Sequence, residues 1–105
     1  MKIWLDDLRD PNAYGRNDML WITKPEFVIK LIGRFDEISF DHDLGTELTG
    51  YDVAKEIEKA AWSGKLKKMP LWKIHSANPI GSRRIKQAMM SAEKGYNEYN
   101  KQNTM

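Results

Sequence analysis

The sequence contains no cysteine among its 105 residues. This absence excludes disulfide-stabilised folds and metal sites with thiolate ligands, and it is typical of proteins in a reducing compartment. No apolar run approaches the roughly 20 residues that a membrane-spanning helix needs. The amino terminus reaches Asp6 and Asp7 too early for the apolar core of a signal peptide. We therefore expect a cytoplasmic protein that does not enter a membrane.

Charge is distributed unevenly along the chain. The formal net charge is only +2, but residues 1–58 contain seven basic and 13 acidic residues, whereas residues 59–105 contain ten basic and two acidic ones. An acidic segment can hold a hard cation, and a basic segment can attract a ligand that carries phosphate. Solvated helix faces of uneven charge are the alternative explanation.

Four short apolar runs predict buried β-strands at residues 3–5, 19–22, 38–40 and 71–74. Residues 8–18 contain proline, glycine and several Asn and Asp without a helical period, which predicts a loop. Helices are expected after the second, third and fourth strands. This alternation favours one α/β domain over residues 1–96 with a parallel sheet and right-handed crossovers. Residues 97–105 are expected to form a polar tail.

The predicted helices begin at recognisable capping patterns. Thr23 and Glu26 have the spacing of a capping box for a helix that would run to about Arg34. Thr49 and Asp52 repeat this spacing for the second helix, which Gly64 would end in a left-handed conformation. The last helix would begin at Pro79, with Asn78 as its cap, and its apolar face would extend to Tyr96.

Polar clusters follow three of the four predicted strands: Asp6-Asp7, Asp41-His42-Asp43 and His75-Ser76-Ala77-Asn78. In open parallel sheets, ligands bind at the carboxyl ends of the strands. If these three strands are neighbours, the clusters meet at one edge. Carboxylates brought together repel each other unless a cation neutralises them, and oxygen ligands favour Mg²⁺, or equally Mn²⁺. Asp6, Asp7, Asp41 and Asp43 are therefore candidate metal ligands, although aspartate also often caps a turn.

The two histidines, His42 and His75, would lie at the ends of adjacent strands, and neighbouring strands are about 4.8 Å apart. Two imidazoles near one bound phosphate could act as general base and general acid, although a histidine at a strand end is more often a hydrogen-bonded structural residue. Ser76, Asn78 and the start of the last helix form a possible phosphate seat, to which Arg83 could add a positive charge. An ordinary capped surface helix is the alternative. Trp62 and Tyr14 are weaker candidates for stacking on a nucleobase.

The acidic pair, the stretch ISFDHDLGTELTGYDVAKEI and the strand that ends in Ser76-Ala77 resemble the receiver domain of response regulators. The resemblance implies a flavodoxin-like three-layer sandwich with a four-stranded parallel sheet in the order 2-1-3-4. It also implies that Asp6 and Asp7 bind Mg²⁺, that Asp41 is the phosphoacceptor and that Ser76 follows the phosphoryl group. Two features depart from a receiver: a loop replaces the first helix, and the fifth βα unit is absent together with its essential lysine.

A closer similarity is to the compact family called the cyclic-phosphate processing receiver domain. The strings LDDLRDP, SFDHDLG, GYDV and IHSANPIG resemble its pattern. This resemblance implies hydrolysis or recognition of cyclic phosphate ends, in RNA repair or in nucleotide-signalling conflict between phage and host.

Three hypotheses follow for the function. The first is a divalent-metal-dependent phosphoesterase that acts on a cyclic phosphate of an RNA end or a small nucleotide, with water activated by a histidine or with direct attack by Asp41. The second is a receiver-like binding module that sequesters a nucleotide or docks on a partner protein. The third, an acyl-phosphate switch on Asp41, lacks the lysine that it would need. The last strand would lie at the sheet edge, so either a monomer or a dimer is compatible with the sequence.

Overall fold

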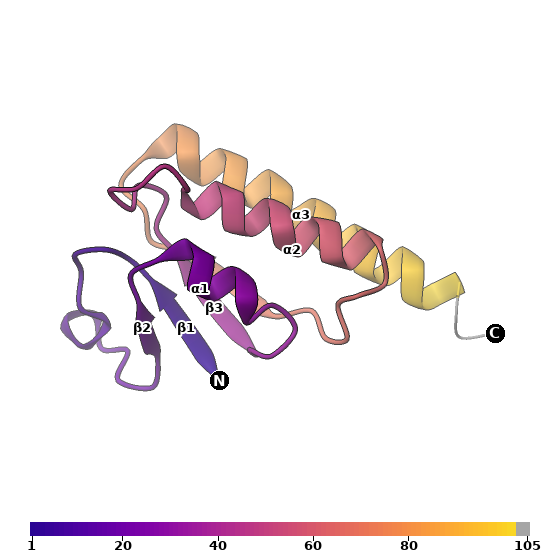
Figure 1. The fold of residues 1–105 in the computed structure, drawn as a ribbon, viewed down its shortest axis with the longest axis horizontal. Helices are drawn as coiled ribbons and strands as arrows, with labels where there is room; N and C mark the ends of the chain where they lie inside the picture. Colours follow the sequence, from indigo (N-terminus) through magenta and orange to yellow (C-terminus); the bar gives the residue numbers. More distant parts are fainter. Residues whose placement is uncertain (103–105) are drawn as a thin grey trace.

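A computed structural model describes residues 1–102 of the chain (Figure 1). Its strands and helices, in chain order, are β1 (Lys2–Leu5), the short 3-10 helix η1 (Pro11–Tyr14), β2 (Leu20–Ile22), α1 (Pro25–Lys30), β3 (Glu37–Phe40), α2 (Gly50–Trp62), β4 (Leu71–Ile74) and α3 (Pro79–Gln102). The four strands and the loop that replaces a first helix are therefore present where the sequence predicts them.

The four strands form one parallel sheet in the order β2-β1-β3-β4, which confirms the predicted order. Leu5 pairs with Phe40, and Phe40 pairs with Ile74, so β1, β3 and β4 end at the same level. The ladder continues one residue further, because the Asp41 N–H donates to the Leu5 carbonyl and the His75 N–H donates to the Phe40 carbonyl, each at 2.9 Å. This register brings the three polar clusters to one edge of the sheet.

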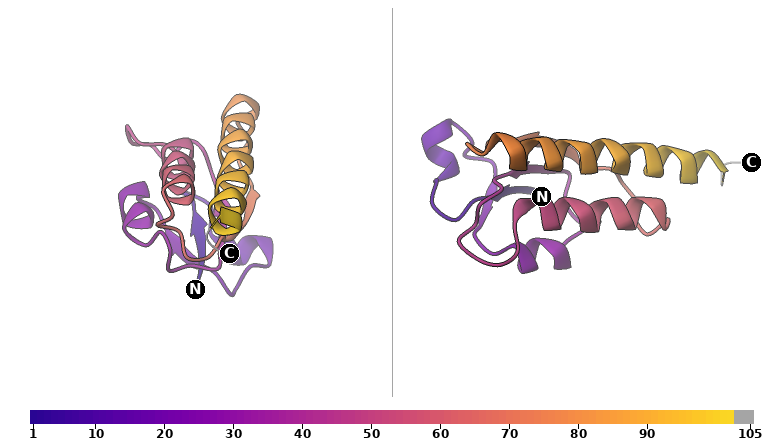
Figure 2. Two further views of the ribbon diagram at one scale, coloured as in Figure 1. Left: turned by 90° about the vertical axis from the view of Figure 1, so that its right-hand side faces the viewer. Right: turned by 90° about the horizontal axis from the view of Figure 1, so that it is seen from above.

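The three α-helices pack on one face of the sheet. Alternate strand residues, among them Ile3, Leu5, Ile38 and Phe40, are fully buried in one apolar cluster with residues of all three helices. Two views at right angles show α2 and α3 lying side by side (Figure 2). Burial of these side chains from water is the main stabilising contribution to a domain of this size.

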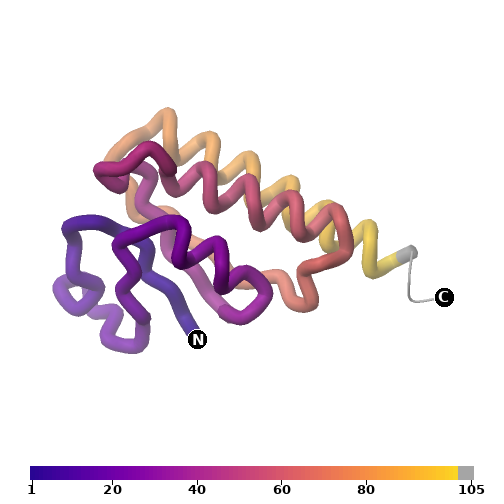
Figure 3. Tube along the Cα trace, viewed as in Figure 1, coloured from indigo at the N-terminus to yellow at the C-terminus, as the bar shows by residue number. Residues whose placement is uncertain are grey.

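The opposite face of the sheet carries Trp4, which is only 2% exposed although no α-helix covers it. The segment between β1 and β2 covers this ring instead, with Tyr14 of η1 at 5.6 Å between ring centroids. The Cα trace shows this segment as a separate lobe beside β1 and β2 (Figure 3). A loop with one 3-10 turn thus forms the layer on this face, where the resemblance to a receiver implies a first helix.

The start of α2 confirms one capping prediction, and the start of α1 contradicts the other. Thr49 caps α2, and Asp52 completes the capping box. The predicted box of Thr23 and Glu26 is absent, because α1 begins at Pro25 after Lys24, which makes no side-chain capping bond. With proline at the first helical position, Glu26 occupies the second position and cannot complete a box. The same helix ends at Lys30, not near residue 34, and residues 31–34 form a turn.

The last helix is longer than the sequence predicts. We expected a polar tail from Asn97, but α3 continues through Gln102. Residues 103–105 of that predicted tail lie outside the described residues. Gly64, which ends α2 with φ of +76° as predicted, lies so close to the Tyr99 ring that no side chain would fit there. This contact extends the packing of α3 against the end of α2 and accounts for the added turns.

Within residues 1–102, no helix combines the length and the apolar character required to cross a bilayer.

Candidate functional site

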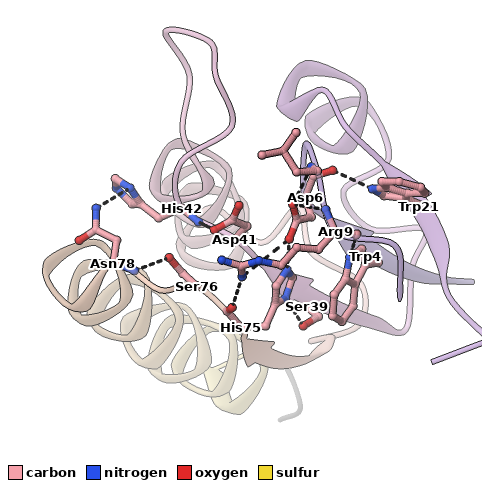
Figure 4. A network of polar contacts seen from close by, with 11 residues as sticks. Trp4, Asp6, Arg9, Trp21, Ser39, Asp41, His42, His75, Ser76 and Asn78 are labelled. Carbon is pink, nitrogen blue, oxygen red and sulfur yellow. Dashed lines mark hydrogen bonds and ion pairs between the residues drawn. The ribbon is translucent and has the colours of Figure 1, made fainter. Parts of the chain in front are cut away.

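An open pocket of about 470 Å³ lies at the carboxyl ends of β1, β3 and β4. The side chains around it come from the three predicted polar clusters and the segments that follow them. Figure 4 shows Asp6, Arg9, Asp41 and Asn78 of this lining. The lining residues are Asp6, Asp7, Leu8, Arg9, Asp41, Asp43, Gly45, Ala77, Asn78 and Pro79. Four carboxylates therefore face one guanidinium group, and this imbalance favours a bound cation.

Three of the four predicted metal ligands converge. One carboxylate oxygen each from Asp6, Asp7 and Asp41 lies within 4.8 Å of the other two. Asp6 and Asp41 are buried, with exposed fractions of 1% and 6%, because they continue the central strands β1 and β3. Asp43 lines the pocket but is not part of this group of three oxygens.

Asp6 is held in place by three hydrogen bonds and one ion pair, which together engage both of its oxygens. Its Oδ1 atom accepts hydrogen bonds from the backbone N–H groups of Leu8 (2.9 Å) and Arg9 (3.0 Å). Its Oδ2 atom accepts a hydrogen bond from His75 Nε2 at 2.9 Å and lies 4.0 Å from Arg9 Nη1. Burial acts to raise the pKa of Asp6, but these hydrogen bonds outweigh it, so the pKa lies below its ordinary value. Asp6 is thus ionised and fixed in position.

Asp41 lies in a different environment. Burial and the neighbouring charge of Asp6 raise the pKa of Asp41, and the hydrogen bond from the His42 N–H at 2.8 Å offsets this only in part. Asp7 receives no hydrogen bond or ion pair from any other residue that the structure describes. A divalent cation would relieve the repulsion and supply the missing partner, and oxygen-only ligands suit Mg²⁺. The acidic group of Asp6, Asp7 and Asp41 could therefore bind such an ion.

His75 is occupied at both ring nitrogens. Its Nε2 atom contacts Asp6, and its Nδ1 atom lies 2.7 Å from Ser39 Oγ. The ring stacks on Trp4, with a centroid distance of 3.8 Å and an interplanar angle of 7°. Burial lowers the pKa of His75 despite the neighbouring carboxylate, so the ring is neutral at pH 7. The neutral ring accepts from the Ser39 hydroxyl and donates to Asp6, which makes it a support for that carboxylate.

His42, which follows the end of β3, points to the face of the sheet opposite to the one that carries His75. Its Nδ1 atom lies 2.9 Å from Asp43 Oδ1, and Asn78 Nδ2 donates to the other Asp43 oxygen at 3.2 Å. The ring packs against Gly81 at the start of α3, where an added side chain would collide with it. His42 Nε2 has no hydrogen-bond partner among the described residues. Neither His42 nor His75 lines the pocket, so the structure does not bring the two imidazoles together over one phosphate position.

The predicted phosphate seat is ordered by its own hydrogen bonds. Asn78 caps α3, because its Oδ1 atom accepts from the Gly81 N–H at 2.9 Å. Ser76 Oγ in turn accepts from the Asn78 N–H at 3.1 Å. Asn78 lines the pocket, whereas Ser76 and the exposed Arg83 do not. The positive end of α3 therefore points toward the site through residues 77–79.

Sequence reasoning missed Arg9. Its Nη1 atom donates to the His75 carbonyl at 2.7 Å, which ties the loop after β1 to the end of β4, and the residue lines the pocket. A basic residue three positions after the first aspartate was the available signal. The two aromatic residues suggested for base stacking are engaged elsewhere: Tyr14 lies over Trp4, and Trp62 packs against α3 and donates to Ser91 Oγ at 3.1 Å.

Comparison with known protein families finds one model that matches, described as the cyclic-phosphate processing receiver domain, over residues 1–91. No curated protein and no solved structure matches the chain. The matched region contains all of the pocket-lining residues and ends within α3.

Proposed function

Because this chain belongs to the family of cyclic-phosphate processing receiver domains, we propose that it is a divalent-metal-dependent phosphoesterase that opens a cyclic phosphate on an RNA end or a small nucleotide. The observation that carries the proposal is the group of three carboxylates within 4.8 Å of one another, on the floor of a pocket bordered by a helix amino terminus. Carboxylates suit a cation, and a helix amino terminus suits a phosphate.

Asp6, Asp7 and Asp41 would hold Mg²⁺ or Mn²⁺. The ion, when bound, would polarise the phosphoryl oxygens of the substrate. We assign Asp43, the fourth predicted ligand, a different role, because its two oxygens are bonded to His42 and Asn78. There it would orient the His42 ring.

The substrate phosphate would lie between the carboxylate group and the start of α3. The helix amino terminus at Asn78 presents positive charge to an anion, and Ser76 fixes the backbone of this turn through its bond to the Asn78 N–H. Arg9 supplies the only cationic side chain of the pocket lining and would balance negative charge on the phosphate. Arg83, one turn into α3, would contact a longer substrate outside the pocket.

Opening the ring requires that water add to phosphorus, that one ribose oxygen leave, and that a proton pass from the water to that oxygen. His42 is our candidate for moving this proton, because its Nε2 atom is unpaired among the described residues and its Nδ1 atom is oriented by Asp43. His75 would keep Asp6 in place instead of acting as a second acid or base. Asp41 would hold the ion and not attack phosphorus itself.

A binding module is the second candidate function, and one observation favours it. Neither imidazole lines the pocket, so no histidine stands ready to transfer a proton in this conformation. A protein of this kind would hold a nucleotide cyclic phosphate through the cation and the helix amino terminus and release it unchanged.

The two functions are distinguished by following 2′,3′-cyclic AMP with the protein and Mg²⁺ by ³¹P NMR. A phosphoesterase converts the cyclic signal to that of a monoester, and chelation by EDTA or Asp41→Asn slows this at least about 100-fold. Glu98→Gln, which alters an exposed carboxylate far along α3, should change the rate less than twofold. An unchanged cyclic signal together with binding in calorimetry would establish the binding module. The absence of both turnover and binding would refute both functions.

A further inference from the structure

Leu8 is the most exposed of the large apolar side chains in the described part of the chain. Its exposed fraction is 82%, and the residue lines the acidic pocket. It directly follows the metal-binding pair Asp6-Asp7. A single exposed leucine is ordinary on a protein surface, so its setting decides whether it has a role.

The backbone around Leu8 is firmly held. The Leu8 N–H donates to Asp6 Oδ1 at 2.9 Å, and the next N–H, of Arg9, donates to the same oxygen at 3.0 Å. The Arg9 carbonyl accepts from Trp4 Nε1 at 2.8 Å, and the Arg9 guanidinium reaches across to the His75 carbonyl. The leucine side chain is thus presented to solvent at the pocket by a backbone that the buried Asp6 fixes.

The other side of the pocket also carries apolar surface, beside the polar Asn78. Ala77 and Pro79 line it, and both are exposed. They follow β4, whereas Leu8 follows β1, and β3 lies between these two strands. Leu8 therefore stands on one side of Asp41 and the pair of Ala77 and Pro79 on the other. The pocket thus combines an acidic floor with apolar surface on two of its sides.

A site that binds only a cation and an inorganic phosphate would require no apolar surface. A ligand with a phosphate at one end and a flat apolar ring at the other would fit both the acidic floor and the apolar surface of this pocket. We propose that Leu8 contacts the nucleobase of the substrate, so that the site selects a nucleoside 2′,3′-cyclic phosphate over a cyclic phosphate without a base. This inference rests on the proposed function, since it places the phosphate over the carboxylate floor. Contact with a base removes leucine surface from water, and this strengthens binding of the base-bearing substrate.

The test compares two substrates that share the five-membered cyclic phosphate: 2′,3′-cyclic AMP, and glycerol 1,2-cyclic phosphate, which has no base. Leu8→Ala should lower kcat/KM for 2′,3′-cyclic AMP about tenfold, mainly by raising KM. The same substitution should change kcat/KM for glycerol 1,2-cyclic phosphate less than twofold. Leu8→Phe should restore the value for cyclic AMP. Leu71→Ala is the matched control, because Leu71 is 71% exposed and remote from the pocket, and it should change neither substrate.

An equal loss of kcat/KM for both substrates in Leu8→Ala, or no loss for 2′,3′-cyclic AMP, would overturn the base contact. Turnover of both compounds by the unaltered protein would in that case still support the proposed function. If neither compound is turned over, the phosphoesterase proposal fails on its own. The same three variants are then compared by calorimetry with Mg²⁺. A tenfold higher Kd for 2′,3′-cyclic AMP in Leu8→Ala alone would support the base contact, and an unchanged Kd or no binding would refute it.

Discussion

Replacing His75 by phenylalanine isolates the contribution of its two hydrogen bonds. A phenyl ring can keep the stacking on Trp4, but it can neither donate to Asp6 Oδ2 nor accept from the Ser39 hydroxyl. Because Asp6 is 1% exposed and Ser39 is 3% exposed, water cannot readily replace either bond. The substitution therefore tests whether His75 supports the carboxylate group, as we infer, or merely fills space.

The expected loss has two parts. A hydrogen bond to a charged group contributes about 1.5–3 kcal/mol, and a buried hydroxyl left without its partner costs about 1–3 kcal/mol. Asp6 keeps its two backbone donors, so we expect the lower part of each range and a total loss of about 2.5–4 kcal/mol. A domain with a free energy of unfolding of about 5–15 kcal/mol remains folded after such a loss. Removing a hydrogen bond that orients a metal-binding carboxylate lowers metal affinity by about 10- to 100-fold.

Urea denaturation without metal measures the loss of stability, and Mn²⁺ titration followed by electron paramagnetic resonance measures the affinity. His75→Gln retains a donor for Asp6 and should recover part of the affinity. His42→Phe is the matched control, because His42 contacts Asp43 and not Asp6, and its Mn²⁺ affinity should change less than twofold. Wild-type Mn²⁺ affinity in His75→Phe would refute the supporting role, and so would an equal loss in the control.

Three further outcomes test the surrounding structure. Thr49→Ala removes the cap of α2 and should lower the free energy of unfolding by about 1 kcal/mol in urea denaturation; no change would mean that the cap is dispensable. Gly50→Ala places a methyl group against the Asp41 carbonyl, so it should destabilise the protein by about 1–3 kcal/mol and weaken Mn²⁺ binding, unlike Thr49→Ala. A hydrogen bond and charge from Lys68, together with the amino terminus, lower the pKa of Asp36 to about 2. The ionised form is favoured on folding, so the stability difference between wild type and Asp36→Asn should be full well above pH 3.8 and be lost as the pH falls through about 2. A difference that does not depend on pH in this range would contradict this assignment.

The sheet and the acidic floor follow from features that are local in the sequence. Three of the four strands are apolar runs that end in a polar cluster, and parallel register then carries Asp6 and Asp41 to the same edge. The capping box of Thr49 forms because no proline shifts the helix start there, whereas Pro25 shifts the start of α1 past the similar pattern at Thr23. Local chemistry thus predicts most of the fold once proline is given priority.

The roles of the two histidines could not be predicted from their positions. Alternation along a strand sends residues 41 and 42 to opposite faces, and only the register of β4 shows that His75 shares a face with Asp6, Ser39 and Trp4. Arg9 escaped notice for a similar reason, since its contact with the His75 carbonyl joins residues 66 positions apart. Long-range contacts of this kind depend on the assembled sheet.

The central claim is that Asp6, Asp7 and Asp41 hold a divalent cation that binds the cyclic phosphate of the substrate. The most direct measurement is an anomalous difference map from crystals of the Mn²⁺-loaded protein grown with 2′,3′-cyclic AMP. We predict one strong peak within coordination distance of these three carboxylates, with phosphate density between the peak and the start of α3 at Asn78. A map with no peak at the three carboxylates, or with the nucleotide bound away from them, would contradict the account.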